Sequence, residues 1–154
     1  MAPPPGPSLE SSFRTSRILH AALVASLLAY AVVVHVYRAV VPFRPLLDEP
    51  VLDGIRLAFY FLAGAVALAV LLLRSRWLTV DAAASAGTQL QTRLIICLAL
   101  AESLGILALL LILMGGSIRD FYVFWVPAIG LQLLLTPTRK VWEAAARGGR
   151  RRSR

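Results

Sequence analysis

Residues 94–116 read LIICLALAESLGILALLLILMGG, and Glu102 is the one charged residue among them. A helix needs about 20 predominantly apolar residues to cross the hydrocarbon core of a bilayer. The composition of the whole chain agrees, since 58% of its 154 residues are hydrophobic and only 16% are charged. Soluble domains have roughly a quarter of their residues charged. The stretch therefore predicts a transmembrane helix.

Three further stretches have the composition of membrane spans, and the last of them is the shortest. They are residues 18–37, 57–73 and 121–136. Together with the first stretch they predict an all-α, integral membrane four-helix bundle over residues 18–136.

The first of these spans has a rival interpretation as a cleaved signal peptide. Arg14 and Arg17 resemble the basic region of such a peptide, and the sequence Ala29-Tyr30-Ala31 resembles its cleavage site. The apolar run continues to Tyr37, however, where a signal peptide would give way to polar chain. We therefore expect a retained span, with cleavage as the alternative.

The distribution of basic residues predicts the orientation. Four spans put both termini on one side of the membrane, and that side carries twelve of the sixteen lysines and arginines. An excess of these residues marks the cytoplasmic side, so both termini are expected to be cytoplasmic. Because the basic residues lie at the ends of the apolar spans, the net charge of +8 indicates membrane orientation rather than nucleic-acid binding.

Two tails flank the predicted bundle. Residues 1–17 are expected to form a disordered cytoplasmic tail, since its first seven residues include four prolines. Residues 137–154 form a basic cytoplasmic tail, which is predicted to act as an orientation signal, with binding of anionic lipids as the alternative. The tail arginines closest to the terminus are Arg147, Arg150, Arg151, Arg152 and Arg154.

The connections between the spans carry three local predictions. Asp53 precedes Gly54 and is expected to cap the second helix. Residues 81–93 are expected to extend the third helix into the cytoplasm. The connection at residues 115–120 is so short that the third and fourth spans must be antiparallel neighbours.

Glu102 is the residue that an apolar span does not explain. It lies nine residues after Arg93, the last charge before the span, and a rise of about 1.5 Å per residue places it about 13–14 Å into the membrane. Half of the hydrocarbon core is roughly 15 Å thick, so Glu102 is expected near the midplane. A carboxyl group there should be protonated, paired, or turned away from lipid.

Polar partners for Glu102 can be chosen by depth. Gln132 lies at the same level of the fourth span, and Ser26 and Tyr30 lie near the middle of the first. Since no lysine or arginine lies within a span, we expect a neutral Glu102 hydrogen-bonded to Gln132, with Ser26 or Tyr30 nearby. Small residues next to it in the third span, among them Gly105, would let another helix approach closely.

Two functional interpretations of this group remain open. In the first, Glu102 and Gln132 hold helices together, which is worth about 0.6–2 kcal/mol in a membrane. In the second, Glu102 binds and releases a proton or cation, as acids inside membranes often do.

Residues 98–111, LALAESLGILALLL, resemble the ion-carrying helix of rotary ATPase c subunits, the proteolipid family. That helix has a similar Ala-Glu pair followed by a leucine-rich run. The resemblance implies a protonatable carboxylate, and only Glu102 matches it. The rest of the chain departs from the family, because the second span has only one glycine, Gly64, and the acid lies in the third span rather than the last.

No nucleophile–base pair, metal cluster or phosphate-binding loop is visible, and Cys97 is expected to be a small apolar filler. We therefore predict a non-enzymatic accessory or structural subunit of a membrane assembly, without cofactor or metal, with a proton- or cation-handling subunit as the alternative. Its expected partners are the bilayer and other membrane subunits or further copies of the chain. Fifteen arginines against one lysine favour a bacterial cytoplasmic membrane.

Overall fold

The computed structural model describes residues 9–41, 46–75, 86–140 and 142–144. Its elements are four α-helices, namely α1 (Leu9–Val40), α2 (Glu49–Ser75), α3 (Ala86–Leu113) and α4 (Ile118–Leu134). Within these residues there is no strand. The expected all-α class is therefore confirmed.

Three of the helices have the length and apolar composition needed to cross a membrane: α1, α2 and the segment Gly87–Leu113 of α3. This agrees with an integral membrane protein. Helix α4 has 17 residues, slightly fewer than the 20 or so that usually span the hydrocarbon core.

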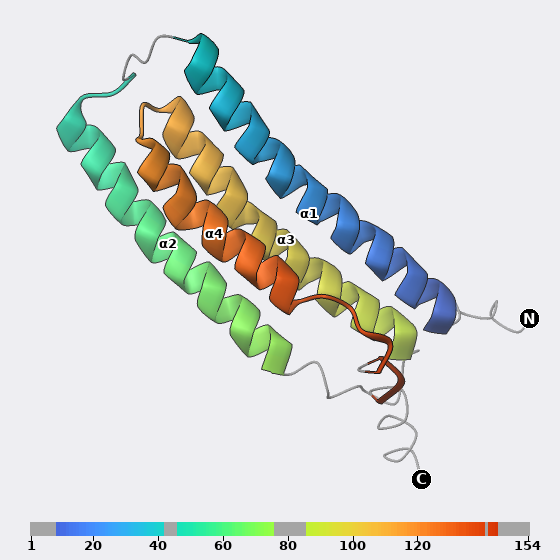
Figure 1. Ribbon diagram of the computed structural model, residues 1–154. Helices are drawn as coiled ribbons and strands as arrows, with labels where there is room; N and C mark the ends of the chain where they lie inside the picture. Colours follow the sequence, from blue (N-terminus) through green and yellow to red (C-terminus); the bar gives the residue numbers. More distant parts are fainter. Residues whose placement is uncertain (1–8, 42–45, 76–85, 141, 145–154) are drawn as a thin grey trace, which may run out of the picture.

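Helix α3 occupies the centre of the arrangement (Figure 1) and packs against each of the other three helices. Half of the residues in its apolar window are buried, compared with 11% for α1 and 6% for α2. The outer faces of α1 and α2 are consequently apolar and exposed, as expected for helices that face lipid.

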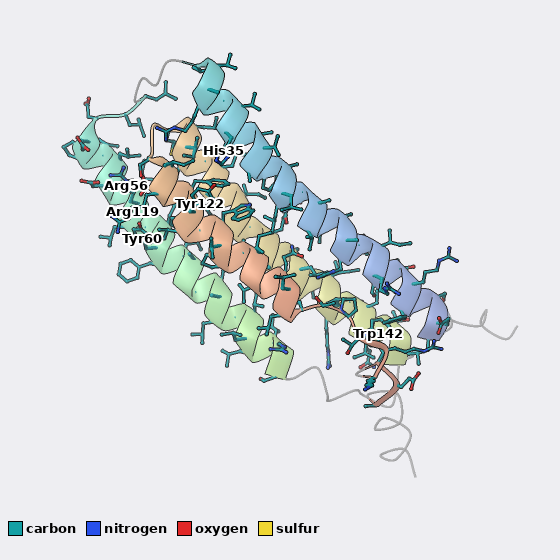
Figure 2. The ribbon with its side chains drawn as sticks, in the orientation of Figure 1. His35, Arg56, Tyr60, Arg119, Tyr122 and Trp142 are labelled. Carbon is teal, nitrogen blue, oxygen red and sulfur yellow. The ribbon has the colours of Figure 1, made fainter. Side chains whose placement is uncertain are left out.

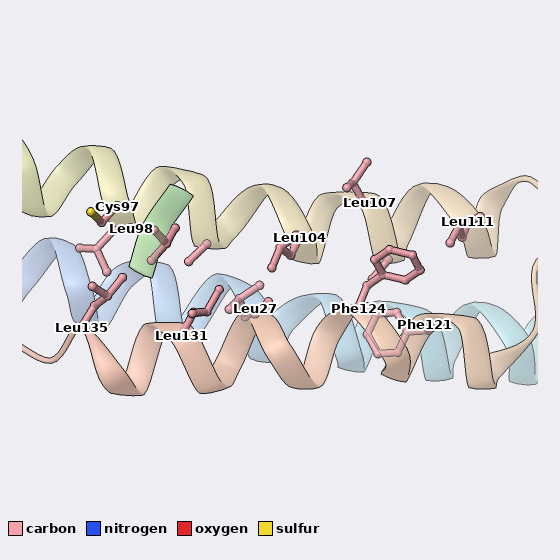
Figure 3. Close-up of a cluster of buried hydrophobic side chains, with 14 of the residues drawn as sticks. Leu27, Cys97, Leu98, Leu104, Leu107, Leu111, Phe121, Phe124, Leu131 and Leu135 are labelled. Atoms are coloured by element: carbon pink, nitrogen blue, oxygen red, sulfur yellow. The ribbon is translucent and has the colours of Figure 1, made fainter. Parts of the chain in front are cut away.

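The apolar core lies mainly between α3 and α4 (Figure 3). Phe121 and Phe124 of α4 are almost completely buried there, and Cys97 is fully buried in the same cluster, as an apolar filler would be. Leu27 is one of only two apolar residues of α1 that are buried. The α3–α4 pair is thus the part of the molecule that positions the other helices.

The turn between α3 and α4 explains why this pair is antiparallel. Gly115 adopts a φ of 104°, a conformation that side chains with a Cβ rarely adopt. Ser117 then caps α4 in a reciprocal capping box with Asp120, in which each side chain accepts from the other residue's backbone N–H. The expected close, antiparallel packing of these two segments is confirmed.

The N-terminal part of α1 corrects an expectation. Residues 9–17 were expected to be disordered, but α1 begins at Leu9. Tertiary contacts explain the difference, because the Phe13 ring packs edge-on against Trp142 with centroids 5.6 Å apart. Ser12 and Ser16 are also buried, at 2% and 0% exposure.

Helix α2 corrects a second expectation. It begins at Glu49 rather than at residue 57, with Pro50 in its first turn, where the missing N–H costs nothing. Asp53 consequently lies inside the helix and does not cap it.

Several expectations concern residues outside the described part of the chain. They are the tail before residue 9, the start of the α3 extension at residues 81–85, and the five arginines Arg147, Arg150, Arg151, Arg152 and Arg154. The described part of α3 does begin before residue 94, at Ala86, as a helical extension requires.

Candidate functional site

Three helices meet at Glu102, and the residues expected to surround it are the ones that do. Ser26 of α1 forms a hydrogen bond with Glu102 Oε1, and Gln132 Nε2 of α4 donates to Glu102 Oε2 at 3.3 Å. Glu102 is 7% exposed and Gln132 is fully buried. We call Ser26, Tyr30, Glu102 and Gln132 the polar junction.

Ser26 makes two polar contacts at the junction. Its hydroxyl lies within hydrogen-bonding distance of both Glu102 Oε1 and the Leu23 carbonyl oxygen, the latter at 2.8 Å. A hydroxyl has a single hydrogen, so the two oxygens compete for it. Ser26 therefore joins the backbone of α1 to the carboxyl group of α3.

Tyr30 completes the junction from α1, where it lies beside both Ser26 and Glu102. Its approach depends on Gly105 of α3. A Cβ at position 105 would collide with the Leu27 side chain and lie 3.4 Å from the Tyr30 ring. The glycine therefore lets α1 come close enough to α3 for the hydrogen bonds of the junction to form, as expected from the small residues beside Glu102.

Gln132 contributes more than the sequence predicted. Its backbone carbonyl oxygen lies 2.8 Å from Nε2 of His20, so the ring of His20 reaches α4 from α1. Its side-chain Oε1 is buried without a hydrogen-bond partner among the described residues. His20 was not expected near Gln132, because six residues, almost two helical turns, separate it from Ser26.

Two aromatic residues of α4 form polar contacts with α1 at two further levels. Neither contact was predicted from the sequence. The indole Nε1 of Trp125 donates to the Leu27 carbonyl oxygen at 2.7 Å. Closer to the α3–α4 turn, the Tyr122 hydroxyl lies 3.2 Å from Nε2 of His35 (Figure 2). Helix α1 is therefore joined to α4 by polar contacts along much of its length.

A second polar group lies at the α3–α4 turn, and we call Asp53, Arg56, Ser117 and Asp120 the turn cluster. Arg56 of α2 donates to Asp120 Oδ2 from Nε at 3.2 Å and from Nη2 at 3.0 Å. The same oxygen accepts from the backbone N–H of Ser117 at 2.7 Å and from its hydroxyl. Asp53 pairs with Nη1 of Arg56 at 2.6 Å.

The chemistry available at the polar junction is that of hydrogen bonds and one carboxyl proton. The described residues contain no group of three His, Cys, Asp or Glu side chains that could hold a metal ion. The junction can therefore join helices, or it can release and regain the proton of Glu102.

Comparison with known proteins does not add to this description. No protein-family model matches the chain, and no curated protein or solved structure is significantly similar to it.

Proposed function

We propose that the chain is a non-enzymatic integral membrane protein that acts as an accessory or structural subunit of a membrane assembly. In this proposal α4 is a fourth span, the four helices form a transmembrane bundle, and both termini are cytoplasmic. A bacterial cytoplasmic membrane is the proposed location, and the basic residues 147–154 are proposed to face its anionic lipids.

The observation that carries the structural role is the way Glu102 is enclosed. Its carboxyl group contacts α1 through Ser26 and α4 through Gln132, so one side chain joins three helices. A neutral carboxyl that is hydrogen-bonded on both oxygens suits a helix-joining role, since each interhelical hydrogen bond in a membrane is worth about 0.6 kcal/mol and up to about 2.

The outward faces of α1 and α2 support a role among other membrane components. Large apolar side chains are exposed on both helices, for example Val32 at 62% and Phe61 at 74%. Surfaces of this kind suit the bilayer, another membrane subunit or a second copy of the chain.

Two variants of Glu102 test the helix-joining role. Glu102→Gln keeps a hydrogen-bonding side chain of the same size, and we expect it to preserve both thermal stability in detergent and migration in native gels of solubilised membranes. Glu102→Leu leaves Gln132 and Ser26 without their partner and should lower both. The control is Ser103→Leu, because among the described residues the Ser103 hydroxyl bonds only to Leu100 of its own helix. Equal behaviour of the two leucine variants would contradict the proposal.

The orientation is tested separately by labelling. In a Cys97→Ser background, a cysteine introduced at position 153 should react with a membrane-impermeant maleimide only from the cytoplasmic side. A cysteine at position 46 should react only from the other side. Labelling of both positions from the same side would refute the four-span topology.

A second function has one specific observation in its favour. Gln132 Oε1 is buried beside Glu102 and has no hydrogen-bond partner among the described residues, so a cation or hydronium ion would find an additional oxygen ligand there. We propose proton or cation handling by Glu102 as the alternative, in line with the resemblance of residues 98–111 to c subunits. In vesicles, Glu102→Gln would abolish ion-linked activity under this alternative and leave assembly intact. Undiminished ion flux in that variant would eliminate it.

A further inference from the structure

A cavity of about 330 Å³ lies where the end of α1, the start of α2 and the α3–α4 turn meet. This volume is at the lower end of the range for ligand sites, so it suits a small polar group. Its lining includes Arg38, Leu47, Glu49, Leu52, Arg56 and Ser117. We call this cavity the turn pocket.

The turn pocket offers two guanidinium groups from different helices. Arg56 is held in place by Asp53 and Asp120, and these pairs use three of its five N–H groups. Two N–H groups of Arg56 therefore have no hydrogen-bond partner among the described residues, and Arg56 lines the pocket together with the guanidinium of Arg38. Paired N–H groups of this kind are well suited to the oxygens of a phosphate group.

The surroundings of the pocket are not positive overall. The carboxylate of Glu49 lines the cavity together with the two arginines, and Asp53 and Asp120 balance the charge of Arg56. A bare anion is poorly matched to such a site, because it would meet a carboxylate as well as the guanidinium groups. A ligand with both a phosphate and an ammonium group is matched by Arg38 and Glu49 together.

The position of the pocket identifies the source of such a ligand. Arg56 and Arg119 lie at the same end of the molecule, the end of the α3–α4 turn (Figure 2). The helices that lead to this end are apolar enough to cross a membrane, so it reaches the level of the lipid headgroups. Leu47 and Leu52 supply an apolar wall on which the start of an acyl chain can lie.

We infer that the turn pocket binds the headgroup of a zwitterionic amino-phospholipid of the phosphatidylethanolamine class, with its phosphate on Arg38 and Arg56 and its ammonium on Glu49. The inference rests on the proposed membrane placement of the chain and not on the role of Glu102.

The test measures lipid retention by the full chain in detergent, by native mass spectrometry and by thermal shift. The probes are phosphatidylethanolamine, phosphatidylglycerol and inorganic phosphate. Wild-type protein should retain phosphatidylethanolamine in preference to phosphatidylglycerol. Inorganic phosphate should neither displace the lipid nor shift the melting temperature. Arg38→Gln should weaken retention about tenfold, since it removes charge-assisted hydrogen bonds to the phosphate.

The matched control is Arg119→Gln, because Arg119 is an arginine at the same end that does not line the pocket. It should retain lipid as the wild type does. Glu49→Gln gives a second, independent readout, since loss of the ammonium partner should abolish the preference for phosphatidylethanolamine over phosphatidylglycerol while total retention persists.

Equal lipid retention by Arg38→Gln and Arg119→Gln would overturn the inference. An unchanged headgroup preference in Glu49→Gln would overturn it as well. So would full displacement of the lipid by inorganic phosphate, which would indicate a site for free phosphate. None of these results bears on the maleimide labelling or on the Glu102 variants. Failure of the lipid site and failure of the proposed function are therefore distinguishable.

Discussion

Two carboxyl groups of this protein are equally buried, and the chain accommodates them in opposite ways. Glu102 and Asp120 are each 7% exposed. Asp120 is paired with Arg56 and also accepts from Ser117. Among the described residues, the partners of Glu102 are uncharged side chains: Ser26, Tyr30 and Gln132.

The difference follows from the position of each residue along its helix. Asp120 lies in the first turn of α4, where backbone N–H groups are unpaired and a basic side chain of α2 can reach it. Glu102 lies in the middle of α3, and the apolar spans supply no lysine or arginine at that level. The carboxyl group at the turn is therefore met by an arginine and by backbone N–H groups, whereas the one at the centre is met by uncharged side chains alone.

The largest expected effect comes from removing the ion pair between Asp120 and Arg56. Asp120→Ala removes the partner of a partly buried arginine together with the capping box of α4. We expect a loss of about 3 kcal/mol in the free energy of unfolding, measured by denaturing-detergent titration, because Arg56 loses its buried partner and keeps only the exposed Asp53.

The control for this prediction is Asp53→Asn, which removes the other carboxylate on Arg56. The side chain of Asp53 is 63% exposed, so its pair should contribute less than about 1 kcal/mol. Equal losses in the two variants would show that burial of Asp120 is not what makes it important.

The next largest effect concerns the close packing of α1 on α3 beside Glu102. Gly105→Ala places a Cβ against the buried Leu27 side chain, and we expect a loss of about 1–3 kcal/mol from overpacking. Gly130→Ala is the matched control, since a Cβ there has no atom within 4 Å. That variant should be neutral or stabilising by up to about 1 kcal/mol, because alanine favours a helix. Stabilisation by both substitutions would contradict the close packing of α1 on α3.

A smaller effect is expected from a single hydrogen bond of the junction. Ser26→Ala removes the hydroxyl between Glu102 and Leu23 and should cost about 0.6–1 kcal/mol in the same titration. Ser103→Ala removes a hydroxyl that donates to the Leu100 carbonyl oxygen of its own helix, and it should change stability by no more than a few tenths of a kcal/mol. If Ser26→Ala were as stable as Ser103→Ala, the hydrogen bond from α1 to Glu102 would not contribute to stability.

Much of the polar junction around Glu102 could be predicted from the sequence. The rise per residue of a helix is constant, so counting from Arg93 and from Phe121 was enough to bring Glu102 and Gln132 to one level. The level of Ser26 followed in the same way. Helical geometry therefore made the junction readable before any contact was known, and the hydrogen bonds among these residues confirm it.

The ion pair of the turn cluster could not be predicted in the same way. The pairing of Arg56 with Asp120 depends on α2 starting at Glu49, eight residues earlier than its apolar run indicates. The helical structure of residues 9–17 similarly depends on Phe13 meeting Trp142. Contacts between residues so distant in the chain leave no periodic pattern in the sequence.

The smallest expected effect concerns the exposed ion pair of the turn cluster. Raising the salt concentration screens interactions between exposed charges, whose range falls to about 3 Å at 1 M. The Asp53–Arg56 pair is the exposed part of the turn cluster, so 1 M NaCl should lower the free energy of unfolding by a few tenths of a kcal/mol. The exposed pairs Arg139–Glu10 and Arg139–Glu143 respond to salt as well, so the salt effect should become smaller, but not vanish, in Asp53→Asn. It should persist unchanged in Ser26→Ala, because no lysine or arginine lies at that level of the spans. A salt effect as large in Asp53→Asn as in the wild type would show that the Asp53–Arg56 pair does not contribute to it.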